Sequence, residues 1–320
     1  MGRRLAHFAG LVCAVVVLNF FLPRLLPGSP VAGGSGAEAV LLPAAAREAL
    51  VQTYHLDDPV AVQFVRYLAG LARGDLGTSL VSHRPVTDIL AERLPWTLFL
   101  VGGAVLLAAV IGGLVGWLAA WKAQARLARA AQAALVGVGT LPEFLVAMLA
   151  IVFLASRWPL FPAGGASTPF EAGGSPLRVL ADVLWHAALP GLVLTIGFAP
   201  PFALLVRGAA VSVLGQPYLV TARAKGLPPR RVAWHALRNA LPPVATLLGL
   251  RLAAAVAGAA VVERIFAYPG MGWLLYQAVA ARDFPVLQGV VFTTSLAVLT
   301  VTLVLDLLAA WFDPRLAGPP

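Results

Sequence analysis

Charged residues are scarce in this chain of 320 residues: they make up 12% of it, whereas soluble domains carry about 25%. Hydrophobic residues make up 60%. The only lysines are Lys122 and Lys225, and neither follows a glycine, so the chain has no GxxxxGK[ST] phosphate-binding loop. The composition excludes an ordinary water-soluble globule, and the missing loop excludes ATP hydrolysis by that route.

Cysteine is also scarce, and the histidines are not clustered. Cys13 is the single cysteine, which excludes an intrachain disulfide and a CxxC metal-binding pair. The five histidines lack HExxH or similar spacing. No GxSxG nucleophile motif occurs either, which disfavours a membrane-embedded hydrolase. We therefore expect no metal, no cofactor and no enzymatic activity.

Six segments are apolar enough to cross a bilayer as helices, which takes about 20 residues each. The first has a signal peptide as its alternative, with cleavage near residues 35–37, but its apolar run exceeds the roughly 7–15 residues usual for such a signal. A GxxxG pair in the second segment, Gly112 and Gly116, indicates close helix packing. The sequence thus predicts an all-α polytopic membrane protein with six transmembrane helices, at residues 5–22, 96–121, 133–155, 184–206, 243–262 and 285–311.

The charges between these segments predict the orientation. The two termini and the second and fourth connections together hold twelve Lys and Arg but one acidic residue, whereas the other connections hold ten Arg and eleven Asp and Glu. Because positive loops stay in the cytoplasm, both termini are expected there. The formal net charge of +9 is then a feature of the cytoplasmic face and gives no reason to expect nucleic acid. About 70 residues between the first two segments lie on the outer side, where we expect short helices lying on the outer face.

The cytoplasmic stretch 207–243 carries six basic residues and no acidic one. Such charge alone also suits a simple anchor beside anionic lipid. Its detail goes further, because Leu219, Ala222 and Gly226 are spaced as a stripe of mostly small side chains on one helical face. A proline pair, 228–229, then breaks the helix before a second one that runs through residues 232–240. A polar helix–break–helix between two spans predicts a docking site for a cytosolic partner.

This loop resembles the EAA-type coupling loop in permease subunits of binding-protein-dependent ABC importers of the dipeptide, oligopeptide and nickel family. The likeness lies in TARAKGL at Thr221–Leu227 and HALRNALPP at His235–Pro243. The glutamate of the general motif is absent, while Gly226 matches the motif glycine. Further motifs resemble the family in order along the chain, at residues 26–30, 73–100, 141–150, 186–198, 261–272 and 305–316.

The resemblance implies a type I importer permease fold and a heteromeric assembly. A second, similar permease would pair with this chain, two ATPase subunits would bind the cytoplasmic loops, and an extracytoplasmic binding protein would deliver solute. Residues 1–95 would hold the first transmembrane helix and the outer segment, and residues 96–320 a five-helix permease core with its coupling loop at 207–242. The residues expected to couple to the ATPase are Leu219, Ala222, Arg223, Lys225, Gly226, Arg230 and Arg231.

Small peptides are the cargo that the resemblance favours, with nickel or a metal chelate as the alternative and the plasma membrane as the location. A different class is a proton-coupled carrier that uses Glu143 and Asp306 as proton sites. Glu143 and Arg251 lie within predicted spans, so we expect them either to face the translocation path or to pair inside the bundle. Residues 268–270 are interpreted as an outer turn and residues 282–285 as the entry to the last span, and these segments either touch the binding protein or are plain surface turns.

Overall fold

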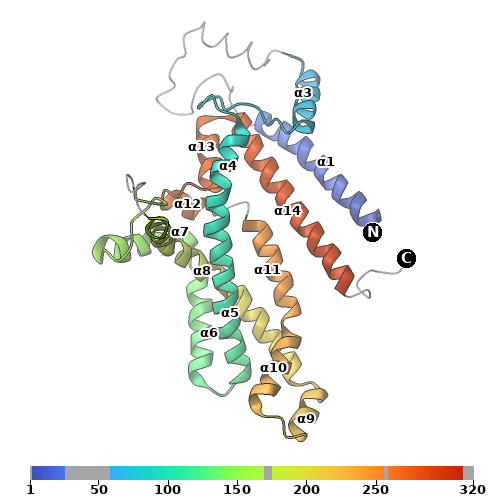
Figure 1. The fold of residues 1–320 in the computed structure, drawn as a ribbon, viewed down its shortest axis with the longest axis vertical. Helices are drawn as coiled ribbons and strands as arrows, with labels where there is room; N and C mark the ends of the chain where they lie inside the picture. Colours follow the sequence, from blue (N-terminus) through green and yellow to red (C-terminus); the bar gives the residue numbers. More distant parts are fainter. Residues whose placement is uncertain (1, 26–57, 169–174, 256–258, 313–320) are drawn as a thin grey trace.

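The computed structural model describes residues 2–25, 58–168, 175–255 and 259–312 (Figure 1). Within these ranges every regular element is a helix, as the sequence predicts. The helices are α1 (Gly2–Leu25), α3 (Val60–Ala72), α4 (Val86–Thr97), η1 (Leu98–Gly102), α5 (Gly103–Trp121), α6 (Arg126–Gly139), α7 (Glu143–Ala150), η2 (Ile151–Arg157), α8 (Pro176–Leu214), α9 (Pro217–Ala224), α10 (Pro229–Ala240), α11 (Pro242–Ala255), α12 (Ala260–Ile265), α13 (Met271–Ala281) and α14 (Phe284–Phe312).

Three described helices are long and apolar enough to cross a membrane: Val86–Trp121, Pro176–Leu214 and Phe284–Val304. The bent pair α6 and α7–η2 makes a fourth if it is counted as one span. α1 and α11 are also apolar but shorter over their described parts. The chain is therefore a helical membrane protein, and six spans with cytoplasmic termini stay a prediction.

The core of the molecule is the packing of α5 against α8. Gly112 and Gly116 face Ala199 and Ala203 so closely that no side chain fits at either glycine. Small residues let two helix backbones approach in this way, which strengthens van der Waals contact where lipid supplies no hydrophobic driving force. The GxxxG pair is confirmed as a packing motif inside the chain.

The third predicted span, residues 133–155, is wrong as one continuous helix. α6 ends at Gly139, α7 begins at Glu143, and the two are bent by 99°. Pro142 explains the break, because proline has no backbone N–H to donate and drives Leu141 out of helical geometry. The Thr140 hydroxyl donates to the Gly137 carbonyl at 2.7 Å and occupies one of the carbonyl groups at the end of α6.

The fifth predicted span, residues 243–262, is also divided. α11 ends at Ala255, and the separate short helix α12 begins at Ala260. Between them Ala259 has φ −115° and ψ 74°, which is not helical. Small residues in this stretch satisfy the apolar pattern of a span but do not by themselves require a helix.

α3, α4 and α13 lie toward one end of the molecule, with α3 beside α1, and α9 and α10 lie at the other end (Figure 1). α3 packs on α1 through Phe64 and Phe20, whose ring centroids are 5.0 Å apart. Asn19 of α1 donates to the Tyr67 hydroxyl at 3.0 Å and to the Gln288 carbonyl of α14 at 2.9 Å. The sequence's expectation of a short helix in this segment is thus met at residues 60–72, where α3 is held against α1, and Asn19 in turn joins α1 to α14.

Candidate functional site

The predicted coupling loop forms two helices, α9 and α10, joined at a left-handed glycine. Gly226 has φ +79°, a conformation that costs an L-residue with a side chain about 1–2 kcal/mol. Its N–H donates to the Arg223 carbonyl at 2.9 Å, and the Leu227 N–H donates to the Ala222 carbonyl at 3.2 Å. This pattern is a Schellman C-terminal cap, and its left-handed backbone conformation explains why the motif has a glycine at this position.

A small apolar cluster holds the two helices together and fixes them to the core. Leu219, Val232 and Ala236 are buried in it, and Leu219 is fully inaccessible to solvent. Around them pack Trp117 and Trp121 at the end of α5, together with Val213, Leu214 and Leu227. The rings of the two tryptophans are stacked, with centroids 5.7 Å apart. A displacement of α9 would therefore be transmitted to α5 and α8 through these side-chain contacts.

The small-residue stripe predicted for one helical face is wrong in its geometry. α9 ends at Ala224, so Gly226 lies beyond the helix. Leu219 faces inward to the cluster and is not available to an external partner. The helical spacing of these residues gave the wrong prediction because it assumed that the helix continues through Lys225 and Gly226. The left-handed conformation of Gly226 ends the helix before that point.

The remaining predicted coupling residues lie at the surface. Ala222 is half-buried, whereas the basic side chains at this end are exposed: Arg223, Lys225, Arg230 and Arg231. Two exposed apolar side chains accompany them, Val220 on α9 and Trp234 on α10. The loop thus presents a basic surface with apolar patches, which suits an acidic groove that also has an apolar floor.

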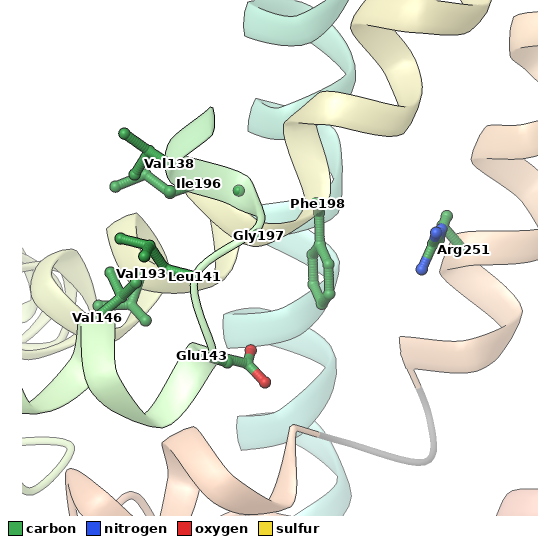
Figure 2. A pocket seen from close by; sticks show the side chains of 10 residues that line it. Val138, Leu141, Glu143, Val146, Val193, Ile196, Gly197, Phe198 and Arg251 are labelled. Carbon is green, nitrogen blue, oxygen red and sulfur yellow. The ribbon is translucent and has the colours of Figure 1, made fainter. Parts of the chain in front are cut away.

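A second candidate site is a pocket of about 240 Å³ at the break between α6 and α7 (Figure 2). α8 and α11 complete its wall. Glu143 enters from the first turn of α7, and Arg251 enters from α11 on the opposite side (Figure 2). The structure thus brings together the two residues that the sequence singled out inside predicted spans.

Glu143 and Arg251 do not form the direct contact that their opposite charges suggest. Among the described residues, no hydrogen bond or ion pair involves either side chain. Both are half-buried, and in Figure 2 Phe198 is seen between them. Asp306, the other carboxylate considered, has a side chain outside the described residues.

One buried charged residue was missed by sequence reasoning. Glu263 on α12 is fully buried, and it accepts hydrogen bonds from the Thr97 hydroxyl at 2.8 Å and from the Trp273 N–H at 3.0 Å. The Thr97 hydroxyl in turn accepts the Met271 N–H at 2.6 Å. Glu263 therefore caps the first turn of α13 and ties it to the end of α4. The signal that could have found it is an acidic residue close before a Pro-Gly helix start, since carboxylates stabilise helix N-termini.

Tyr268 contradicts one of the two alternatives for residues 268–270, namely a plain surface turn. Its side chain is fully buried, and its ring lies edge-on to Trp96 at 6.0 Å. Burial, and secondly the charge of Glu263, raises the pKa of the Tyr268 hydroxyl. Burial also raises the pKa of Glu263, while the hydrogen bonds that it accepts act in the opposite direction. The turn is thus part of a packed junction between α4, α12 and α13.

Asp283 makes a second junction on the same side of the molecule. Its carboxylate accepts from the Ser79 hydroxyl and from the Leu80 N–H at 3.2 Å, although some 200 residues separate these partners in the chain. It is 4% exposed. Residues 74–85 therefore form a loop pinned to the start of α14, where the sequence had led us to expect short helices.

A family described as "Binding-protein-dependent transport system inner membrane component" matches residues 98–318. The chain belongs to this family. The matched range includes both the coupling loop and the pocket, so these two sites lie in the part of the chain that defines the family.

Relatives extend the likeness over nearly the whole chain. The "Probable D,D-dipeptide transport system permease protein DdpB" of Escherichia coli K12 is 36% identical, over 95% of this chain and 93% of its own length. The "Dipeptide transport system permease protein DppB" of Bacillus subtilis is 34% identical, over 99% and 97%. The "Glutathione transport system permease protein GsiC" of Pectobacterium atrosepticum is 34% identical, over 98% and 97%. The resemblance to permeases of the dipeptide and oligopeptide family is confirmed.

Proposed function

We propose that this chain is a permease subunit of an ATP-driven importer of di- and oligopeptides in the plasma membrane, and forms half of the translocation pathway. The observation that carries the proposal is the near full-length similarity to permeases whose names specify dipeptides and glutathione. Nickel or a metal chelate is the alternative cargo, and these names favour peptides over it. A second, similar permease, two ATPases and an extracytoplasmic binding protein complete the assembly. The chain's own part is transport, and the ATPases hydrolyse ATP.

The α9–α10 pair is proposed to transmit the movement of the ATPases. Its exposed basic residues would meet an acidic groove on an ATPase, while Leu219 secures α9 to the tryptophans of α5. ATP-driven closure of the ATPases would then displace α5 and α8 together, because their backbones are in close contact. Alternation between inward-open and outward-open states follows from such a rigid-body movement.

Transport by the full complex tests this function. The chain is reconstituted in proteoliposomes with its partner permease, ATPases and binding protein, and uptake of radiolabelled alanyl-alanine is measured with and without ATP. Uptake that needs ATP and the binding protein is expected. Uptake driven by a proton gradient without ATP would instead identify the proton-coupled carrier, and uptake of nickel but not of peptide would identify the alternative cargo.

A charge-reversed coupling surface tests how the ATPases dock. Arg230→Glu combined with Arg231→Glu should weaken ATPase binding to the permeases and lower peptide-stimulated ATP hydrolysis, because the variant repels an acidic groove. The matched control is Arg126→Glu with Arg129→Glu at the start of α6, where both arginines are also exposed. Equal effects of the two double variants would contradict docking at α9–α10 and leave only a general role for positive charge.

A further inference from the structure

The pocket between α7, α8 and α11 holds one charge of each sign. Glu143 and Arg251 approach it from opposite sides (Figure 2), and within the described ranges neither has a hydrogen-bonding or ionic partner. Ionisable groups within membrane-spanning segments are costly, and those that occur commonly mark ligand pathways. Two uncompensated charges facing one cavity therefore call for a ligand that compensates both.

We propose that this pocket binds the two charged termini of a free peptide, with the α-carboxylate on Arg251 and the α-ammonium group on Glu143. This inference rests on the proposed function and gives it a site within the permease. A guanidinium can bind a carboxylate through two parallel hydrogen bonds, and a carboxylate is a natural acceptor for an ammonium group.

The charge pattern selects this ligand class over others. A simple anion would satisfy Arg251 but would be repelled by Glu143, and a metal cation would meet the reverse problem. A zwitterion compensates both residues at once and adds no net charge to the bilayer interior. The free peptide is thus the cargo class whose charges match the pocket.

The size and the remaining wall of the pocket indicate how much peptide it takes. Its volume of about 240 Å³ is somewhat below the roughly 300–1,000 Å³ of common small-molecule sites, so it fits a dipeptide better than a longer chain. Apart from the two charges, the side chains that line the pocket are apolar, with Val146 and Phe198 among them. Gly197 contributes no side chain, and a Cβ there would have no other atom within 4 Å. Such a wall accepts varied peptide side chains, while the charges fix the backbone.

Equilibrium binding to the purified complex, with the binding protein omitted, tests the assignment. The probes are radiolabelled alanyl-alanine, its N-acetyl derivative, which lacks the ammonium group, and its amide, which lacks the carboxylate. Arg251→Gln should weaken binding of the first two by about tenfold or more, and it should not weaken binding of the amide, whose positive charge Arg251 repels. Glu143→Gln should weaken binding of alanyl-alanine and of the amide similarly, and it should not weaken binding of the N-acetyl derivative, whose negative charge Glu143 repels. Equal losses for all three probes, or no binding of alanyl-alanine to the wild-type complex, would overturn the proposal.

A variant that fills the pocket tests the assignment without changing either charged residue. Gly197→Leu should fill the pocket and abolish binding without loss of thermal stability, because open space surrounds that position. Gly208→Leu is the matched control: it lies on the same helix, also with nothing within 4 Å, and does not line the pocket. Unchanged binding in Gly197→Leu would place the ligand elsewhere. ATP-driven peptide uptake by the wild-type complex tests the proposed function separately, so a failed pocket and a failed function are distinguishable.

Discussion

The close contact between α5 and α8 makes a sharp prediction about three glycines that lie within five residues of each other. A Cβ on Gly116 would stand 2.9 Å from the carbonyl carbon of Ala203 and 3.0 Å from its Cα, where ordinary contact is 3.4–4 Å. A Cβ on Gly112 would stand 3.0 Å from the Cβ of Phe202. By contrast, a Cβ on Gly113 would stand 3.9 Å from the nearest side-chain atom, on Val206.

The same substitution should therefore have opposite effects at neighbouring positions. Alanine stabilises a helix by about 0.5–1 kcal/mol relative to glycine, and this gain is all that Gly113→Ala should show. Gly116→Ala must in addition push two backbones apart, and overpacking of this kind costs about 1–3 kcal/mol. We expect a net destabilisation of about 1–2 kcal/mol for Gly116→Ala and for Gly112→Ala.

Thermal unfolding of the purified permease in detergent measures these differences. The melting temperature should fall for Gly112→Ala and Gly116→Ala and should stay level or rise for Gly113→Ala. Combining the first two should lower it further, although not additively, because both substitutions move the same pair of helices. Equal melting temperatures for all three single variants would refute the close packing of α5 on α8.

Three further substitutions test the junction at Glu263, the glycine cap of α9 and the junction at Asp283. Glu263→Gln should lower the free energy of unfolding by about 1–3 kcal/mol, because a buried carboxylate that caps α13 is lost, whereas Glu92→Gln, at an exposed ion pair, should change it by less than about 1 kcal/mol. Gly226→Ala should cost about 1–2 kcal/mol through its positive φ and reduce ATPase coupling in the reconstituted complex, while Gly215→Ala, at φ −83°, should do neither. Asp283→Asn should loosen residues 77–81 and speed their cleavage in limited proteolysis; an unchanged cleavage rate would argue against that tie.

Composition and periodicity predicted the helical class and the helix–break–helix of the basic loop, although not the end of its first helix. Residues 229–240 form the second helix of the basic loop, which the sequence predicted to begin with a proline in its first turn. The GxxxG pair was correctly interpreted as helix packing, because small residues at that spacing have few other uses in a bilayer. The sequence also singled out both charges of the pocket, although not their arrangement around it.

Breaks within apolar runs were harder to predict. Residues 133–155 satisfy the hydropathy of a span, yet the chain turns by 99° at Pro142. Proline is also present inside α8, at Pro190, Pro200 and Pro201, where the helix continues. Neighbouring helices and local backbone adjustment can accommodate proline in one place and not in another. Proline therefore breaks the helix at one position and is tolerated within a helix at others, and the packing around it decides which of the two occurs.

By itself, the sequence determined that this protein is a helical membrane protein of the binding-protein-dependent permease family with a basic loop between two apolar helices. These properties depend on hydropathy, charge and local motifs, which can be recognised directly in the order of residues. Only the tertiary structure decided that Leu219 faces inward, that Glu263 is a buried cap and that Glu143 and Arg251 share one pocket. Each of these depends on contacts between segments far apart in the chain, and no local pattern specifies which side chains such packing brings together.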